Sequence, residues 1–164
     1  MKKYIIILIT ILLPFCLFAQ KFSIQKNGTV IDTENHLMWM QKDYDAYEGK
    51  HLPNYTWSEA NEWCKSINKS NFGGYSDWRL PTVSEYKTLF RTAASRKMVN
   101  NAFILKNKEY AYWTCRKLNK YIATVVWTDE YYSDSQSVDP LLFEKNENVR
   151  VGHPSVLLVR AYKK

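Results

Sequence analysis

The sequence has 164 residues, of which 46% are hydrophobic and 24% are charged, and its formal net charge is +7. This length suits one domain with a core of its own and excludes a chain of several large domains. The positive charge favours association with acidic partners, but it does not indicate the fold.

The first 19 residues have the pattern of a secretory signal peptide. Lys2 and Lys3 precede an apolar run from Tyr4 to Phe18, and the small Ala19 follows it. The run is shorter than the about 20 apolar residues of a transmembrane helix. We therefore expect export to the periplasm, the cell surface or the medium, with membrane contact only through this segment. A lipoprotein modified at Cys16 and an uncleaved anchor are the less favoured alternatives.

Residues 20–164 are the expected folded domain. Without the two lysines of the signal segment, 21 bases stand against 16 acids, which leaves a net charge of +5. Two cysteines remain, Cys64 and Cys115. In an oxidising compartment they form a disulfide or persist as two buried free thiols, and their spacing does not decide between these alternatives.

The domain begins with strand patterns. Residues Phe22 to Asp32 predict a hairpin that turns at Asn27-Gly28, and Leu37–Met40 predict a short buried strand. The polar residues from Asp43 to Asn54 predict a surface loop.

No cofactor is expected from the sequence. The acids of the polar segment do not follow an EF-hand spacing, so calcium is only a minor alternative there. The histidines lack the spacing of a zinc site. These candidate ligands are Asp43, Asp45 and Glu48 for calcium, and His36, His51 and His153 for zinc.

Two helices are predicted around a rigid corner. Thr56 to Glu59 form a capping box that opens a helix to about Lys69, and Thr82 to Glu85 form another that opens a helix to about Ala94. The corner between them holds two glycines, a tryptophan between an acid and a base, and a proline that prevents helix before it. We expect Trp78 to be the buried anchor of a structural motif, and a catalytic role for the neighbouring charges is the less favoured alternative. The motif residues are Asp77, Trp78, Arg79 and Pro81.

Charge is segregated in the second half of the chain. Nine bases and one acid lie between Lys87 and Lys120, whereas six acids and one base lie between Asp129 and Glu147. A basic run attracts polyanions, and a solvated surface without a partner is the alternative. The acidic segment, predicted to be loop-rich, could neutralise the basic one in the fold.

The remaining apolar runs predict strands. They are Tyr110–Thr114 and Ile122–Trp127, joined by a turn at Arg116–Lys120, and a final buried strand at Val156–Ala161.

The corner, Gly73-Gly74-Tyr75-Ser76-Asp77-Trp78-Arg79-Leu80-Pro81-Thr82, resembles the signature of the DUF1566 family, which includes the C-terminal domain of the Legionella collagen-like adhesin. At one turn the family usually has Thr-Gly where this chain has Asn35-His36. The resemblance implies an α+β fold, a single C-type-lectin-like domain similar to the formylglycine-generating enzyme, with two helices packed on short antiparallel strands and long loops. Further matches are Asn27–Asp32, Leu37–Trp39, the residues Trp57, Glu59, Ala60 and Cys64 of the first helix, Tyr112–Thr114 and Val159-Arg160.

From the resemblance and the basic run we expect a non-enzymatic, adhesin-like binding domain of a bacterial cell surface or secreted protein. Its partner would be an anionic glycan or surface polymer, in preference to nucleic acid. A structural or assembly subunit that binds protein is the alternative, and a homo-oligomer is left open. The expected ligand contacts are Arg91, Arg96, Lys97, Lys106, Lys108, Arg116, Lys117 and Lys120, with Tyr131 and Tyr132 as aromatic contacts to sugar.

A degenerate enzyme of the formylglycine-generating type is a third alternative. That chemistry uses two cysteines close together late in the chain, whereas here only Cys115 lies late. The sequence also lacks a phosphate-binding glycine loop, a nucleophile elbow and a metal-binding helix motif. We therefore expect no catalytic residue.

Overall fold

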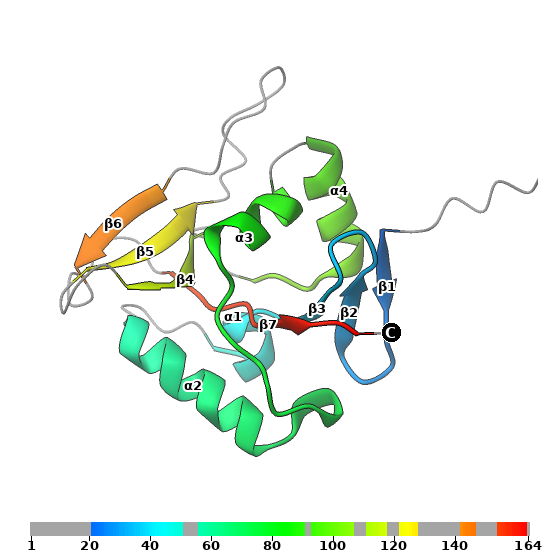
Figure 1. Cartoon of the computed structure of the whole chain (residues 1–164), viewed down its shortest axis with the longest axis horizontal. Coiled ribbons are helices and arrows are strands. Elements are labelled where there is room, and N and C mark those ends of the chain that lie inside the picture. The colour runs from blue at the N-terminus through cyan, green and yellow to red at the C-terminus, as the bar shows by residue number, and fades with distance from the viewer. Residues whose placement is uncertain are drawn as a thin grey trace, which may run out of the picture.

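A computed structural model describes residues 21–50, 56–90, 93–106, 111–117, 122–127, 142–146 and 154–163. Across these residues the protein is α+β, as expected, with two antiparallel sheets and four α-helices (Figure 1). In this part of the chain no helix is both long and apolar enough to cross a membrane.

The first sheet contains the predicted hairpin and the buried strand that follows it. Its strands β1 (Phe22–Ile24), β2 (Thr29–Asp32), β3 (Leu37–Met40) and β7 (Val159–Ala161) lie in the order β1-β2-β3-β7. Trp39 is opposite Val30 on one side and Val159 on the other. The last strand is shorter than predicted. Residues 156–158 are buried outside the ladder, where the carbonyl of Leu158 accepts from the Met40 N–H at 3.0 Å.

The second sheet has three strands, β4 (Ala111–Lys117), β5 (Ile122–Trp127) and β6 (Leu142–Asn146), in that order. The first two were predicted, but β4 continues through Arg116 and Lys117, where the sequence predicted the start of the turn. The rest of the predicted turn, residues 118–120, lies outside the described residues. The prediction of loop for 129–147 was wrong at β6. Its register places Phe143 opposite Val125 and Leu142 opposite Val126, so residues 142–146 form a third strand inside the acidic segment.

A short helix replaces part of the predicted surface loop. Helix α1 (Tyr44–Glu48) begins after Asp43, whose Oδ1 accepts the N–H of Ala46 at 2.9 Å. The other oxygen of Asp43 accepts the Lys106 N–H at 2.9 Å and the Tyr112 hydroxyl at 3.2 Å. Asp43 is therefore buried, caps α1 and connects this helix to Lys106 and Tyr112. The polar composition of the segment predicted a surface loop and did not indicate this role.

Three longer helices follow, α2 (Trp57–Lys69), α3 (Val83–Phe90) and α4 (Ala93–Ala102). The capping box at Thr56 and Glu59 is formed as predicted, with both reciprocal hydrogen bonds. The predicted second helix ends earlier than Ala94, and α4, which was not predicted, begins at Ala93. Val99 and Ala102 of α4 are buried, so this helix contributes to the core with a face of its own.

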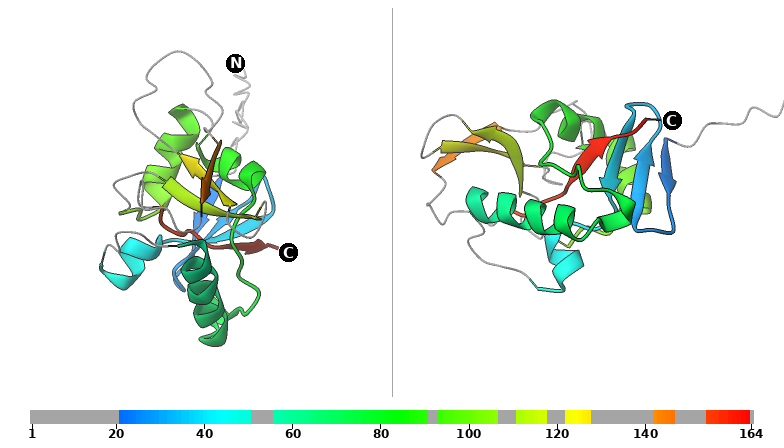
Figure 2. Two further views of the ribbon diagram at one scale, coloured as in Figure 1. Left: turned by 90° about the vertical axis from the view of Figure 1, so that its left-hand side faces the viewer. Right: turned by 60° about the horizontal axis from the view of Figure 1, so that its bottom comes forward.

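Alternation along β3 divides the core in two. Met38 and Met40 pack with α2 residues such as Cys64, whereas Leu37 and Trp39 pack with residues of α3 and α4. Successive side chains of a strand point to opposite faces of the sheet, so helices cover the first sheet on both of its faces. Figure 2 shows α2 on one side of these strands and α3 and α4 on the other.

Candidate functional site

The corner between α2 and α3 is built around Trp78. Its side chain is 2% exposed, as the anchor hypothesis requires, and its Nε1 donates to the Phe72 carbonyl at 3.0 Å. A short 3₁₀ turn, η1 (Phe72–Gly74), brings that carbonyl over the indole. Phe72 also packs edge-on against the indole, with ring centroids 5.9 Å apart.

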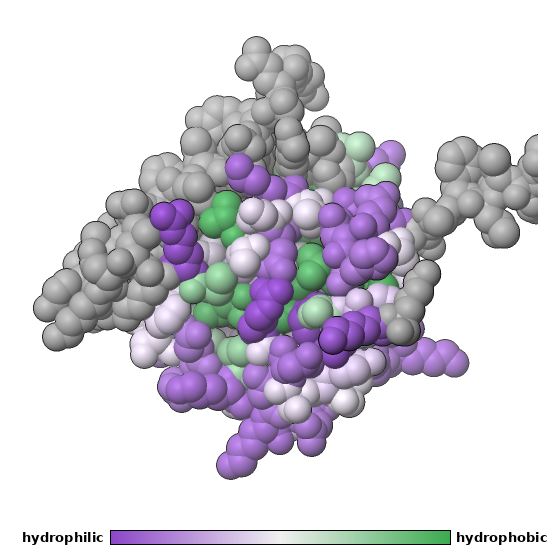
Figure 3. All heavy atoms as spheres, in the orientation of Figure 1, coloured by the Kyte–Doolittle hydropathy of each residue, from purple (hydrophilic) through white to green (hydrophobic). Residues whose placement is uncertain are grey.

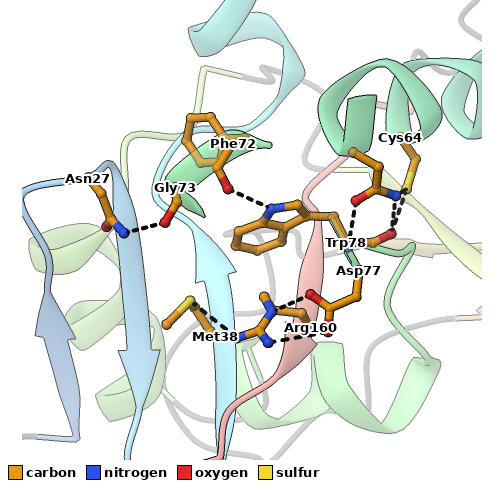
Figure 4. A network of polar contacts seen from close by, with 9 residues as sticks. Asn27, Met38, Cys64, Phe72, Gly73, Asp77, Trp78 and Arg160 are labelled. Atoms are coloured by element: carbon orange, nitrogen blue, oxygen red, sulfur yellow. Dashed lines mark hydrogen bonds and ion pairs between the residues drawn. The ribbon is translucent and has the colours of Figure 1, made fainter. Parts of the chain in front are cut away.

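The corner is held from α2 by Asn68, a residue that the sequence did not single out. Its Oδ1 accepts the Trp78 N–H at 2.7 Å, and its Nδ2 donates to the Trp78 carbonyl at 2.8 Å. Cys64, one helical turn earlier, donates its Sγ–H to the same carbonyl at 3.1 Å (Figure 4). One feature of the sequence could have identified Asn68. Its amide lies beside the apolar stripe of the predicted helix, and a partly buried amide is expected to have a hydrogen-bond partner.

Asp77 pairs with the last strand and not with the neighbouring Arg79. The Nε of Arg160 donates to Asp77 Oδ1 at 2.6 Å and its Nη2 donates to Oδ2 at 3.2 Å. The guanidinium of Arg160 also lies 3.8 Å from the centre of the Tyr75 ring. The hydrogen bonds from Arg160 lower the pKa of the Asp77 carboxyl. The pair therefore fixes the corner to β7.

Arg79 pairs with the start of α3. Its Nη1 donates to Glu85 Oε2 at 2.9 Å, and that carboxylate also accepts the Thr82 N–H at 2.7 Å. The hydrogen bonds that Arg79 donates to Glu85 raise the pKa of the Arg79 guanidinium. Burial acts to raise the pKa of Glu85, but the hydrogen bonds and charge of Arg79 and the donors of Thr82 together lower it. Both charges of the motif are thus engaged by partners within the fold.

The backbone of the corner joins the two sheets. Arg79 and Val159 exchange two hydrogen bonds, of 2.9 and 3.0 Å, which extend the first sheet beyond β7. Two residues later the Pro81 carbonyl accepts the Cys115 N–H of β4 at 2.8 Å. In Figure 1 this segment runs across the front of β7 toward α3. The motif is therefore a connector between strands that are far apart in the sequence.

The two cysteines are free thiols, so the disulfide alternative does not hold in this structure. Cys64 is buried, and this burial raises its pKa to about 11. Cys115 is exposed, contrary to the alternative of two buried thiols, although partial burial still raises its pKa. The sequence could not show that the helix α2 directs Cys64 at Trp78 instead of at β4.

The described members of the predicted basic site lie on α4, on β4 and in the segment after α4. Lys97 on α4, Lys106 after α4, and Arg116 on β4 are exposed. Arg96 lies in α4 and Lys117 in β4, and only their backbones are described. The predicted contacts that lie outside the described residues are Arg91, Lys108, Lys120, Tyr131 and Tyr132.

Figure 3 shows hydrophilic residues over most of the described surface on the face of Figure 1, with apolar residues confined to small areas between them. Within the described ranges, three or more His, Cys, Asp or Glu side chains are nowhere grouped as a metal site would require. The face seen in Figure 3 is therefore mostly hydrophilic across the described residues.

Comparison with known families agrees with the resemblance seen at the corner. The family model described as the Lcl C-terminal domain matches residues 28–151. None of the curated proteins matches the chain. The match covers most of the sequence, including β2, β3, both capped helices and the whole corner, and the chain therefore belongs to the Lcl C-terminal domain family.

Proposed function

We propose that the protein is an exported, adhesin-like binding domain that recognises an anionic glycan or a cell-surface polymer. The observation that carries this proposal is the match to the Lcl C-terminal domain over residues 28–151. The surplus of bases between residues 87 and 120 supports the choice of an anionic partner.

Lys97, Lys106 and Arg116 are the described residues that would meet the ligand. Their side chains are exposed, and they belong to the basic run. Ammonium and guanidinium groups pair with sulfate and carboxylate groups, and salt weakens such pairs when they are exposed to solvent. The affinity should therefore depend on the number of these bases and decrease with ionic strength.

Retention on immobilised heparin at two salt concentrations tests the proposal. We expect the triple variant Lys97→Ala, Lys106→Ala, Arg116→Ala to elute at lower salt than the wild type. A matched control removes the same charge from exposed lysines outside the basic run, at Lys26, Lys50 and Lys69. Equal losses in the two triple variants would show that only net charge matters, and retention that does not respond to salt would end the proposal.

A second candidate is an assembly subunit that binds protein. Met98 and Ile104 are 46% and 43% exposed, and they lie within two residues of Lys97 and Lys106 in the sequence. Exposed apolar side chains beside bases favour a protein surface over a sugar. A stoichiometric complex that is lost in Met98→Ser, Ile104→Ser and retained in the lysine variants would favour this candidate.

We also propose that the domain has no enzymatic activity of the formylglycine-generating type. The thiol of Cys64 is engaged by the Trp78 carbonyl, and a pKa of about 11 leaves little thiolate at neutral pH. Turnover that disappears in Cys64→Ser and Cys115→Ser variants that still fold would contradict this proposal.

A further inference from the structure

The hairpin turn between β1 and β2 carries the one Asn-Gly pair of the sequence, Asn27-Gly28. Asn27 is exposed, and Gly28 has a φ of +80°. Without a side chain, a glycine lets its own backbone nitrogen approach the side-chain carbonyl carbon of the preceding residue. Asn-Gly is for this reason the pair in which an asparagine most readily loses its amide, and asparagine is among the thermolabile residues.

Both polar atoms of the Asn27 side chain are engaged in the folded protein. Nδ2 donates to the Gly73 carbonyl at 2.9 Å, and Oδ1 accepts the Thr29 hydroxyl at 2.8 Å. Figure 4 shows the first of these bonds, which joins the hairpin to the corner. The contact is close, since a Cβ built on Gly73 would lie 2.9 Å from Thr29 Cγ2 and 3.4 Å from Asn27 Nδ2.

We propose that Asn27 is a site of spontaneous deamidation whose rate is restrained by these two hydrogen bonds, and that its product releases the hairpin from the corner. The Gly28 nitrogen attacks Asn27 Cγ, and an N–Cγ bond forms. The Cγ–Nδ2 bond breaks, and the amide leaves as ammonia with the proton of the Gly28 nitrogen. Water then opens the cyclic imide to aspartate or isoaspartate, without oxidation or reduction.

The product no longer fits the contact. A carboxylate at position 27 has no hydrogen for the Gly73 carbonyl and places a negative charge against that oxygen, so the bond becomes a repulsion. Isoaspartate in addition inserts a methylene into the backbone of a short turn that sets the register of β1 and β2. This inference is independent of the proposed ligand.

Peptide mapping by mass spectrometry, during incubation at mildly alkaline pH, measures the reaction. We expect conversion at Asn27 in the folded wild type, and faster conversion in Thr29→Val, which retains the shape of Thr29 but removes the hydroxyl donor. Loss of one hydrogen bond of about 1 kcal/mol corresponds to about a fivefold increase in rate. Asn27→Gln is the unreactive control. The proposal is overturned if the folded wild type stays unmodified while the urea-unfolded chain converts, or if Thr29→Val reacts at the wild-type rate.

A second experiment tests whether the product releases the hairpin from the corner. Asn27→Asp reproduces the aspartate product without the chemistry, and we expect it to unfold at lower urea concentration than the wild type. Asn27→Ser, which lacks both the amide donor and the charge, should lie between the two. Wild-type stability of Asn27→Asp would overturn the release of the hairpin.

Discussion

Asn68 fixes Trp78 through its backbone, since its side-chain amide bonds both the N–H and the carbonyl of that residue. In Asn68→Ala the Trp78 N–H loses this partner, which costs about 1–3 kcal/mol, whereas the carbonyl still accepts the Cys64 Sγ–H. We therefore expect a loss of about 1–3 kcal/mol in the free energy of unfolding, measured in urea by tryptophan fluorescence. Asn61→Ala is the matched control, since Asn61 donates to the Trp57 carbonyl of its own helix. Equal losses in both variants would contradict the role given to Asn68.

The pair of Asp77 and Arg160 predicts a pH dependence with a defined sign. Because Arg160 lowers the pKa of Asp77 in the folded state, the pair stabilises the fold above the unfolded value of about 3.9 and loses that effect as the pH falls through the folded value. The Asp77 side chain is 60% exposed, so we expect Asp77→Asn to cost no more than about 1 kcal/mol at neutral pH. The difference from wild type should shrink below about pH 4. A difference that grows in acid would contradict the assignment.

At the scale of elements, local patterns determined most of what the sequence could predict. The Asn27-Gly28 turn, the capping box at Thr56 and the alternating strands follow from interactions between residues close in the chain, and the structure confirms them. The elements that were missed depend on distant contacts. Helix α1 begins at an aspartate that also binds Lys106 and Tyr112, and β6 exists because β5 offers it a partner.

The candidate site shows the same division. The burial of Trp78 could be predicted from the corner motif, but the partner of Asp77 lies 83 residues away, which spacing in the sequence does not reveal. The surplus of bases between residues 87 and 120 is visible in the sequence. Which of these bases lie close together depends on how α4 and β4 pack, and the sequence does not show that. The choice between a disulfide and free thiols likewise depends on the direction in which α2 points Cys64.

The two glycines of η1 allow a test of how the turn fits the hairpin. Both have positive φ, +64° at Gly73 and +90° at Gly74, but only Gly73 faces a neighbour at the position of a Cβ. We expect Gly74→Ala to cost about 1–2 kcal/mol from backbone strain alone. Gly73→Ala should cost more, because the methyl group also displaces Thr29. Urea unfolding of both variants measures the difference, and a Gly73→Ala variant no less stable than Gly74→Ala would contradict this packing.

At the scale of the molecule, the corner couples the two sheets into one folding unit. The backbone of Arg79 bonds β7 of the first sheet, and the Pro81 carbonyl bonds β4 of the second. The corner therefore supplies hydrogen bonds to both sheets. We expect the two free thiols to report this coupling. Cys115 should react with a thiol reagent in the native protein, although more slowly than a fully solvated cysteine because its pKa is raised. Cys64 should react only as fast as the whole domain unfolds.

Mass spectrometry of the labelled peptides separates the two sites. Increasing urea should accelerate labelling at Cys64 in parallel with the loss of tryptophan fluorescence, since Cys64 packs in the same cluster as Trp78. Native labelling of Cys64 at the rate of Cys115 would show that α2 opens independently of the sheets.

The position of β7 in the chain has a consequence for biogenesis. It supplies the outer neighbour of β3, yet it is made by the ribosome about 120 residues after its partner. Until residue 161 has emerged, β3 presents unpaired backbone groups, a template for wrong pairing with other chains. A nascent or prematurely terminated chain should therefore be a client for chaperones, whereas the finished one closes its own edge.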